Sequence, residues 1–336
     1  MKIAVDVMGT DFGPDEIVLG ALQAVEEYDC EVVLVGDSVQ IDKILTHNNA
    51  QNNPKVMVQH ASEVIEMSEH PGISVKTKKD ASIVVATGLL HKNECDALVS
   101  AGSTGAAVAA ALFCLGRIKG IERPSIATAI PSITGTTVLL DSGAKVDAKP
   151  GQLVQGAVMG SIYAELILGI KNPRVGLLNI GEEETKGNEQ VLATYPLLKK
   201  ETAINFIGNV EGRDINKGTV DVVVCDGFVG NVVLKVAEGL ATAILTLMKD
   251  AVLNDGILAK IGALLIKPAL MKLKKKLDPA EHGGALLLGV KAPFIICHGS
   301  SKAKAIKNAV RVAINLTEKD VVGRIGTEIL HENGRV

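Results

Sequence analysis

The chain has 336 residues, 47% of them hydrophobic, which is enough for one large or two ordinary domains with a sizeable core. Aromatic residues make up only 2%, Trp is missing and the net charge is −3, which argues against a general nucleic-acid-binding protein. The five cysteines lie far apart, which excludes a disulfide framework and short metal-ligand spacings. We therefore expect reduced thiols, no metal site and no nucleic-acid partner.

The first 120 residues alternate short apolar runs with amphipathic segments. Strands are expected at 3–7, 31–35, 55–58 and 97–100, and helices at 16–28, 40–45, 81–91 and 105–115. Such alternation predicts a parallel sheet with helices on both faces. Met1 and Lys2 lead directly into the first strand, so we expect no signal peptide.

One uncharged stretch, residues 97–116, is long enough to cross a bilayer. Its centre, Ser100 to Gly105, consists of small, hydroxyl and glycine residues that would interrupt a spanning helix. We expect a strand, a loop and a helix of small residues here instead of a membrane span.

The pattern changes at Pro124. Residues 126–130 and 136–140 flank a Pro- and Gly-containing segment and predict an antiparallel excursion. Alternation then resumes, with strands expected at 174–179, 204–207, 220–224, 286–290 and 293–297, and helices at 152–168, 188–199, from 229, and at 301–316. We expect a three-layer α/β/α fold with a mostly parallel sheet, divided into one unit of residues 1–124 plus 288–336 and a second of 125–287.

Residues 256–277 combine an apolar helical stripe with a lysine cluster and contain no acidic residue. The stripe consists of Ile257, Leu258, Ile261, Leu264 and Leu265, and the cluster of Lys260, Lys267, Lys272, Lys274, Lys275 and Lys276. Pro268 is expected to kink or split the segment. A basic amphipathic segment suits an anionic membrane or an acidic partner, and a dimer-interface helix with a solvated lysine face is the alternative.

Four segments share the order strand, glycine-containing loop, helix: 98–105, 175–187, 220–235 and 295–301. Parallel strands present their carboxyl ends at one edge, so we expect these loops to form a single crevice. Glycine lets backbone N–H groups approach an anion, and a helix N-terminus adds positive partial charge. The four loops therefore indicate an anion-binding crevice.

The individual candidates each have a plainer interpretation. The dinucleotide fingerprint, the Walker A loop and the nucleophile elbow do not occur in the sequence. Ser103 or Thr104 either binds an anion or caps a helix, and Lys186 is either a phosphate ligand or part of a solvated acidic loop. His298 is either an acid–base group or a core histidine, and Ser300 or Ser301 is expected to cap the last helix.

Five motifs follow one another along most of the chain, at residues 6–11, 100–106, 179–187, 226–231 and 298–301. Together these motifs resemble the bacterial phosphate acyltransferases of phospholipid synthesis. The resemblance implies a fold similar to isocitrate and isopropylmalate dehydrogenases and to phosphotransacetylase, and a homodimer. It also implies acyl transfer from acyl carrier protein to inorganic phosphate without a cofactor. A cytoplasmic, peripherally membrane-associated enzyme with a downstream glycerol-phosphate acyltransferase as a further partner would fit this role.

For this chemistry we assign the phosphate to the Ser103–Gly105 loop and to Lys186, and an oxyanion or phosphate contact to Asn231. The catalytic candidates are Lys186, Asn231 and His298, and the substrate-binding candidates are Ser103, Thr104, Gly105, Asp226 and Gly227. Two alternatives remain. A dehydrogenase of the same fold would need Asp metal ligands and an Arg cluster that the sequence does not show. A non-enzymatic carrier-protein or membrane-surface adaptor would need only residues 260–276.

Overall fold

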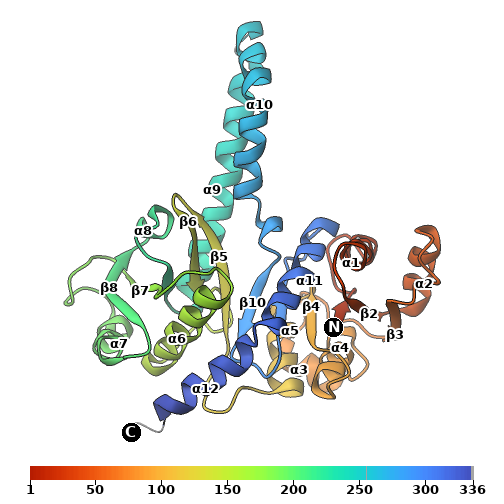
Figure 1. Ribbon diagram of the computed structural model, residues 1–336, viewed down its shortest axis with the longest axis horizontal. Coiled ribbons are helices and arrows are strands. Elements are labelled where there is room, and N and C mark those ends of the chain that lie inside the picture. Colours follow the sequence, from red (N-terminus) through yellow and green to blue (C-terminus); the bar gives the residue numbers. More distant parts are fainter. Residues whose placement is uncertain (255, 334–336) are drawn as a thin grey trace.

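The computed structural model describes residues 1–254 and 256–333 as one long twisted sheet with helices on both faces (Figure 1). The strand order is β3-β2-β1-β4-β11-β10-β5-β6-β9-β7-β8. The strands are β1 (Lys2–Asp6), β2 (Glu31–Gly36), β3 (Val56–His60), β4 (Ala97–Ser100), β5 (Ser125–Ser132), β6 (Gly135–Leu140), β7 (Arg174–Asn179), β8 (Asn205–Glu211), β9 (Val222–Val224), β10 (Ala285–Leu288) and β11 (Phe294–Ile296).

The helices follow the alternation expected from the sequence. They are α1 (Asp15–Glu27), α2 (Ser38–His47), α3 (Pro71–Thr77), α4 (Ser82–His91), α5 (Thr104–Ala110) with a π-helical turn (Ala111–Leu115), α6 (Pro150–Leu166), α7 (Glu189–Lys200), α8 (Asp214–Lys217), α9 (Gly227–Asn254), α10 (Gly256–Leu277), a 3₁₀ turn (Pro279–Glu281), α11 (Ala303–Glu318) and α12 (Val321–Asn333). The mostly parallel α/β class is confirmed, and the excursion after Pro124 is the antiparallel pair β5–β6.

Two groups of parallel strands make up the sheet, and they run in opposite directions. β1, β2, β3, β4 and β11 form one group, and β6, β9, β7 and β8 form the other. Three successive antiparallel pairs join them: β11 with β10, β10 with β5, and β5 with β6. An odd number of reversals inverts the strand direction, so the carboxyl ends of the two groups lie at opposite edges of the sheet.

Aliphatic and small side chains fill the layers between sheet and helices. Val5 and Val99 face the helices on one side of the sheet, and Ala4 and Leu98 face those on the other, as period-two alternation requires. The uncharged stretch 97–116 is β4 followed by α5, both largely buried, so the expectation that it is not a membrane span fits the observed packing. Four cysteines are buried, Cys114 is half-buried, and all five are free.

Helices α9 and α10 form an antiparallel hairpin that projects far out of the body (Figure 1). The expected split at Pro268 is wrong, because α10 continues through this residue and packs against α9. A proline removes one helical hydrogen bond, and contacts with the neighbouring helix stabilise α10 against that loss. The side chains of Ile257, Lys274 and Lys275 lie outside the described ones.

The hairpin exposes many apolar side chains. On α9 they follow a helical stripe of Val232, Val236, Leu240, Ile244 and Leu247, and on α10 they include Leu258, Ile261, Leu264, Leu265, Ile266 and Met271. Residues 227–252 are long and apolar enough to cross a membrane, by length and composition only. Such a large exposed apolar surface marks an interaction site.

The base of the hairpin is tied to α11. Lys304 Nζ lies 2.8 Å from Asp278 Oδ2 and 2.9 Å from Glu281 Oε1. Asn308 Nδ2 donates to the Ala280 carbonyl at 2.7 Å, and Arg311 Nη2 donates to the Glu281 carbonyl at 2.9 Å. The segment that returns from the hairpin is therefore fixed to the helix that follows the His298 loop.

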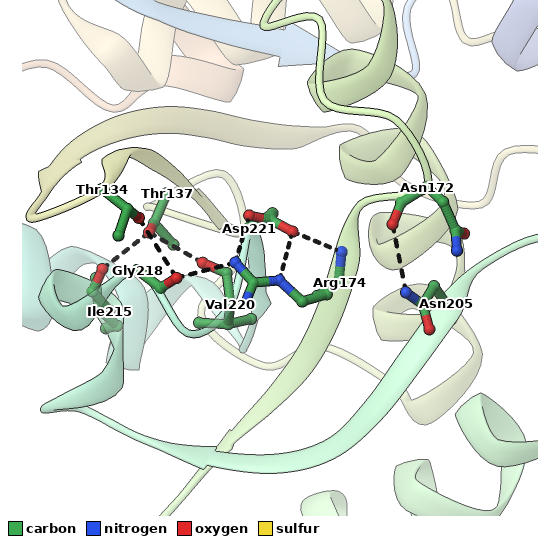
Figure 2. A network of polar contacts seen from close by, with 9 residues as sticks. All are labelled: Thr134, Thr137, Asn172, Arg174, Asn205, Ile215, Gly218, Val220 and Asp221. Atoms are coloured by element: carbon green, nitrogen blue, oxygen red, sulfur yellow. Dashed lines mark hydrogen bonds and ion pairs between the residues drawn. The ribbon is translucent and has the colours of Figure 1, made fainter.

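A second polar network joins the amino ends of β7 and β9 (Figure 2). The backbone N–H and Nε of Arg174 donate to Asp221 Oδ2 at 2.8 and 2.9 Å, and Arg174 Nη2 donates to Asp221 Oδ1 at 2.9 Å. Thr137 Oγ1 donates to the Ile215 carbonyl at 2.8 Å and so connects β6 to α8. This network lies opposite to the loops that follow β7 and β9 at their carboxyl ends.

Candidate active site

Three loops meet at the carboxyl ends of β1, β4 and β11. The backbone N–H of Asp11 donates to the Gly299 carbonyl at 3.0 Å, and Cys297 N donates to the Ser100 carbonyl at 2.8 Å. A Cβ at Gly9 would lie 3.7 Å from Gly102 Cα, so the first two loops also touch. The predicted residues Ser103, Thr104, Gly105 and His298 belong to these loops, and we name these four the first-edge cluster.

Ser103 is the N-cap of α5, because its Oγ accepts from Ala106 N at 3.4 Å. The side chain of Ser103 is buried, whereas Thr104 and Gly105 are exposed. A Cβ at Gly105 would lie 2.6 Å from Pro71 Cγ, so this glycine permits the close approach of α3. The capping interpretation of Ser103 is confirmed, and Thr104 supplies the exposed hydroxyl of this loop.

His298 is exposed and is held by Ser300. The Ser300 backbone N–H donates to His298 Nδ1 at 3.2 Å, and Ser300 Oγ lies 2.7 Å from the same nitrogen. Since Nδ1 accepts a hydrogen bond, the proton of the neutral ring belongs on Nε2. The core-histidine interpretation is therefore wrong, and Nε2–H is available as a donor at the surface.

The expected serine cap of α11 is also wrong. The helix begins at Ala303, whose N–H donates to Glu16 Oε2 at 2.9 Å. This carboxylate comes from α1, near the other end of the chain. It accepts from a backbone N–H of the first turn of α11, which a nearby serine was expected to do. Ser300 is free of that task and orients His298 instead.

Sequence reasoning gave no role to three side chains beside this cluster. Lys302 Nζ lies 5.8 Å from the ring centroid of Phe12, a cation–π arrangement on the loop after β1. Met67 Cε lies 3.0 Å from the position of a Cβ on Gly299. Phe12 and Met67 are both about half exposed and give this edge an apolar rim. Phe12 could have been noticed in the sequence, because aromatic residues make up only 2% of this chain.

The second edge carries Asp226, Gly227 and Asn231 at the start of α9. Asp226 Oδ1 accepts from Phe228 N and Val229 N, both at 2.9 Å, and thereby caps the helix. Gly227 N donates to the Lys145 carbonyl at 2.8 Å, and a Cβ at Gly227 would lie 2.5 Å from that same oxygen. Asp226 and Gly227 thus have structural roles, while the Asn231 side chain is exposed.

Asp141 organises this second edge, and sequence reasoning gave it no role. Its Oδ1 accepts from the backbone N–H groups of Ile126, Gly143 and Ala144 at 2.9 to 3.1 Å, and its Oδ2 accepts from Lys145 N at 2.8 Å. Burial raises the pKa of Asp141, although the four N–H donors oppose that shift. The run Asp141-Ser142-Gly143, directly after an expected strand, could have indicated this turn.

Lys186 is exposed on the loop after β7. Its backbone carbonyl accepts from Asn179 Nδ2 at 3.0 Å, and its N–H donates to the Glu183 carbonyl at 3.1 Å. Since β7 and β9 are neighbouring parallel strands, Lys186 belongs to the same edge as Asn231. We name Lys186, Asp226, Gly227 and Asn231 the second-edge cluster.

The expectation of one crevice is wrong, because the two clusters lie at opposite edges. Four strands separate β4 from β9 in the sheet. At the usual strand spacing the loops after β4 and β9 are therefore roughly 24 Å apart across the sheet. Within a single chain, Thr104 and Asn231 cannot contact the same phosphate ion. In residues 1–254 and 256–333, no group of three His, Cys, Asp or Glu side chains is arranged to hold a metal ion.

Comparison with known proteins identifies the family. A family model described as fatty acid synthesis protein matches residues 1–324. The phosphate acyltransferase of Pelotomaculum thermopropionicum is 57% identical over 329 residues, which cover 98% of this chain and 95% of that protein. The chain belongs to the phosphate acyltransferase family. The phosphate acyltransferase of Aquifex aeolicus is 56% identical, covering 93% of this chain and 92% of that protein.

Solved structures of other proteins share the fold. The phosphotransacetylase from Streptococcus pyogenes has a TM-score of 0.64 at 17% identity, covering 96% of this chain and 94% of that chain. A putative 4-hydroxythreonine-4-phosphate dehydrogenase from Salmonella typhimurium has a TM-score of 0.54 at 11% identity, covering 94% and 99%. At these identities the likeness concerns the fold alone. Membership of the phosphate acyltransferase family favours an enzyme over the adaptor alternative and over a dehydrogenase.

Proposed function

We propose that the protein transfers a fatty acyl group from the thioester of acyl carrier protein to inorganic phosphate. A phosphate oxygen attacks the thioester carbonyl, the C–S bond breaks, and the products are acyl phosphate and the free carrier thiol. The proposal is supported by membership of the phosphate acyltransferase family over residues 1–324. A thiolate leaves readily because the pKa of a free thiol is about 8.5, so no covalent enzyme intermediate is required.

The exposed loop cluster at the first edge is the observation that carries our placement of the phosphate. Thr104 offers a hydroxyl and His298 offers Nε2–H, both at the surface of joined loops. Positioning of phosphate against the carbonyl contributes several kcal/mol in such a transfer, and donors aimed at the developing oxyanion stabilise the transition state further. We therefore place the phosphate at Ser103, Thr104 and Gly105, with the Nε2–H of His298 as a further hydrogen-bond donor to it.

We further propose that Lys186 and Asn231 act in this reaction across a homodimer. They lie at the edge opposite to Thr104 in the same chain, so a second copy would have to supply them. Asp226 and Gly227 hold the start of α9 and thereby place Asn231. Two-fold symmetry would complete two such sites in each dimer.

The test of the activity is thiol release from acyl-carrier thioester. We expect release to require inorganic phosphate and to proceed without metal or nucleotide, with acyl phosphate as the stoichiometric product. Thiol release at the full rate in a buffer free of phosphate and arsenate would contradict the proposal.

We propose that Gly256–Leu277 attaches the enzyme peripherally to a membrane. Its exposed apolar side chains and its lysines without acids suit an anionic lipid surface, and each Lys near it contributes about 1 kcal/mol. Leu258 is 81% exposed, so Leu258→Glu should abolish flotation with anionic vesicles. Leu330→Glu replaces an exposed leucine of the body and should float like the wild type. Wild type that does not float would contradict membrane attachment.

The remaining expectations are part of the same proposal. We propose a cytoplasmic enzyme divided into residues 1–124 plus 288–336 and residues 125–287. Acyl phosphate released beside a membrane would reach a glycerol-phosphate acyltransferase without leaving the lipid surface.

A further inference from the structure

A carboxyl group is buried directly beneath the first-edge cluster. Asp6 ends β1, pairs with Ser100 across the sheet and is 2% exposed. It borders a small cavity of about 10 Å³, together with Gly102, Ser103 and Ser82. Burial of a carboxyl group without an ion-pair partner costs free energy, which makes Asp6 a candidate for a functional role.

The hydrogen bonds of Asp6 lead to two of the three loops of the site. Ser100 Oγ donates to Asp6 Oδ2 at 2.8 Å, and Gly102 N donates to Ser100 Oγ at 3.3 Å. Met8 N donates to Asp6 Oδ1 at 3.4 Å. The carboxylate is thus a common acceptor for the turn after β1 and, through Ser100, for the turn that leads to Ser103 and Thr104.

The two turns also pack closely against each other at two glycines. A Cβ at Gly102 would lie 3.3 Å from the Met8 carbonyl and 3.6 Å from Asp6 Oδ2. Gly9 has a φ of +72°, which favours glycine, and a Cβ there would lie 3.7 Å from Gly102 Cα. A change in the hydrogen bonds of Asp6 would therefore move the Ser103–Gly105 loop directly.

We propose that Asp6 is a positioning residue that, through Ser100, sets the phosphate-binding geometry of the Ser103–Gly105 loop. The inference rests on the proposed function, because it needs phosphate to bind at this loop. Asp6 acts through Ser100 and Gly102 and does not touch the substrate.

The charge state of Asp6 gives the proposal a measurable signature. Burial raises the pKa of Asp6 to about 6, against the hydrogen bonds from Ser82, Ser100 and Met8 that lower it. The other residues that line the cavity are apolar, glycine or serine. Behind Val64, Lys78 Nζ lies 2.6 Å from Glu69, so the charges on that side are paired. Above pH 6 the ionised Asp6 accepts from Ser100 Oγ on one oxygen and from Met8 N on the other. Below pH 6 one of these oxygens carries a proton and accepts more weakly.

The experiment compares Asp6→Asn with wild type as the KM for phosphate is measured from pH 5 to pH 8. At pH 8 we expect a KM about tenfold higher in the variant, the size of one hydrogen bond, with kcat changed less than about threefold. At pH 5 the two values should agree within about twofold, because wild-type Asp6 is then protonated as well. Taking the ratio of the two enzymes cancels the titration of phosphate itself.

Each other outcome is decisive. A KM ratio that stays constant with pH, or a loss confined to kcat, would overturn the role of Asp6. Wild type without phosphate-dependent thiol release would instead overturn the proposed function. If Asp6→Asn does not fold, Ser100→Ala decides: it removes the bridging hydroxyl, and an unchanged KM at pH 8 overturns the proposal. Thr87→Val, which removes another buried hydroxyl that bonds only to the Ile83 carbonyl, is the control and should leave KM unchanged.

Discussion

The two edges of the sheet share the sequence pattern of strand, glycine-containing loop and helix, but the pattern has a different role at each edge. At the first edge the loops after β4 and β11 leave Thr104 and His298 exposed. At the second edge the glycines after β9 are used for packing: a Cβ at Gly230 would overlap the Asp141 carbonyl, and one at Gly227 would crowd Lys145. A strand, a glycine and a helix therefore do not by themselves indicate a binding loop, because glycine also serves wherever two backbones meet.

The largest expected effect tests whether the second edge takes part in the chemistry. Lys186→Ala or Asn231→Ala should lower turnover about 10²–10³-fold, the usual cost of one preorganised donor, without a change in Tm. Both side chains are exposed, so little packing is lost. Turnover near that of wild type in both variants would show that the second-edge cluster takes no part in the reaction.

A mixture of two variants tests whether each site takes its residues from one chain or from two chains. Thr104→Ala and Asn231→Ala subunits, mixed in equal amounts and allowed to exchange, should regain about a quarter of wild-type turnover if each site takes residues from two copies. No recovery would mean that each centre lies within one chain.

The next effect concerns packing at the second edge. Gly230→Ala should lower the free energy of unfolding by about 3 kcal/mol, since its methyl group would overlap the Asp141 backbone. Gly239→Ala is the matched control on the same helix, with no atom within 4 Å of the added Cβ. It should raise stability by about 0.5 to 1 kcal/mol. Equal unfolding curves for both variants would show that α9 can shift away from Asp141.

The smallest effect concerns the amino ends of β7 and β9 (Figure 2). Asp221→Asn should lower stability by about 1 to 2 kcal/mol and leave turnover unchanged, because the pair lies away from both clusters. Desolvation opposes ionisation of Asp221, but the Arg174 donors outweigh it and hold the pKa below the ordinary 3.8.

This pKa fixes the sign of the pH dependence. The stabilisation by Asp221 is complete above pH 3.8 and is lost as pH falls through the lower folded pKa, so the two unfolding curves should converge there. Asp29→Asn, which removes an exposed partner of Lys55, should change nothing measurable. A difference that persists below that pH would contradict the ion-pair account.

The sequence predicted the elements well, because alternation of strand and helix leaves a local signal in almost every segment. It also predicted the antiparallel excursion from Pro131 and Gly135, which lie on either side of the turn between β5 and β6. It could not predict that the antiparallel pairing of β10 and β5 inverts the direction of the second group of parallel strands relative to the first. Strand direction depends on pairing between residues more than a hundred positions apart, such as Leu286 with Ala127, and no local pattern records it.

The sequence allowed candidate site residues to be chosen one by one, but it did not predict how they assemble. Thr104 and His298 could be singled out because their residue types carry chemistry, and their loops do meet at one edge. Asp6 and Asp141 received no role, since their importance comes from neighbours far along the chain. The cap of α11 was misassigned for the same reason: Glu16 provides it from the other end of the sequence.

The length of the hairpin and its anchoring on α11 have a mechanical consequence. A helix of 22 residues extends about 33 Å, and α10 joins the body through a short segment that Lys304, Asn308 and Arg311 of α11 hold. A sideways force at the tip is therefore delivered with mechanical advantage to α11, which starts five residues after His298. Whatever restrains the far end of the hairpin has a short, stiff path to the loop that carries this histidine.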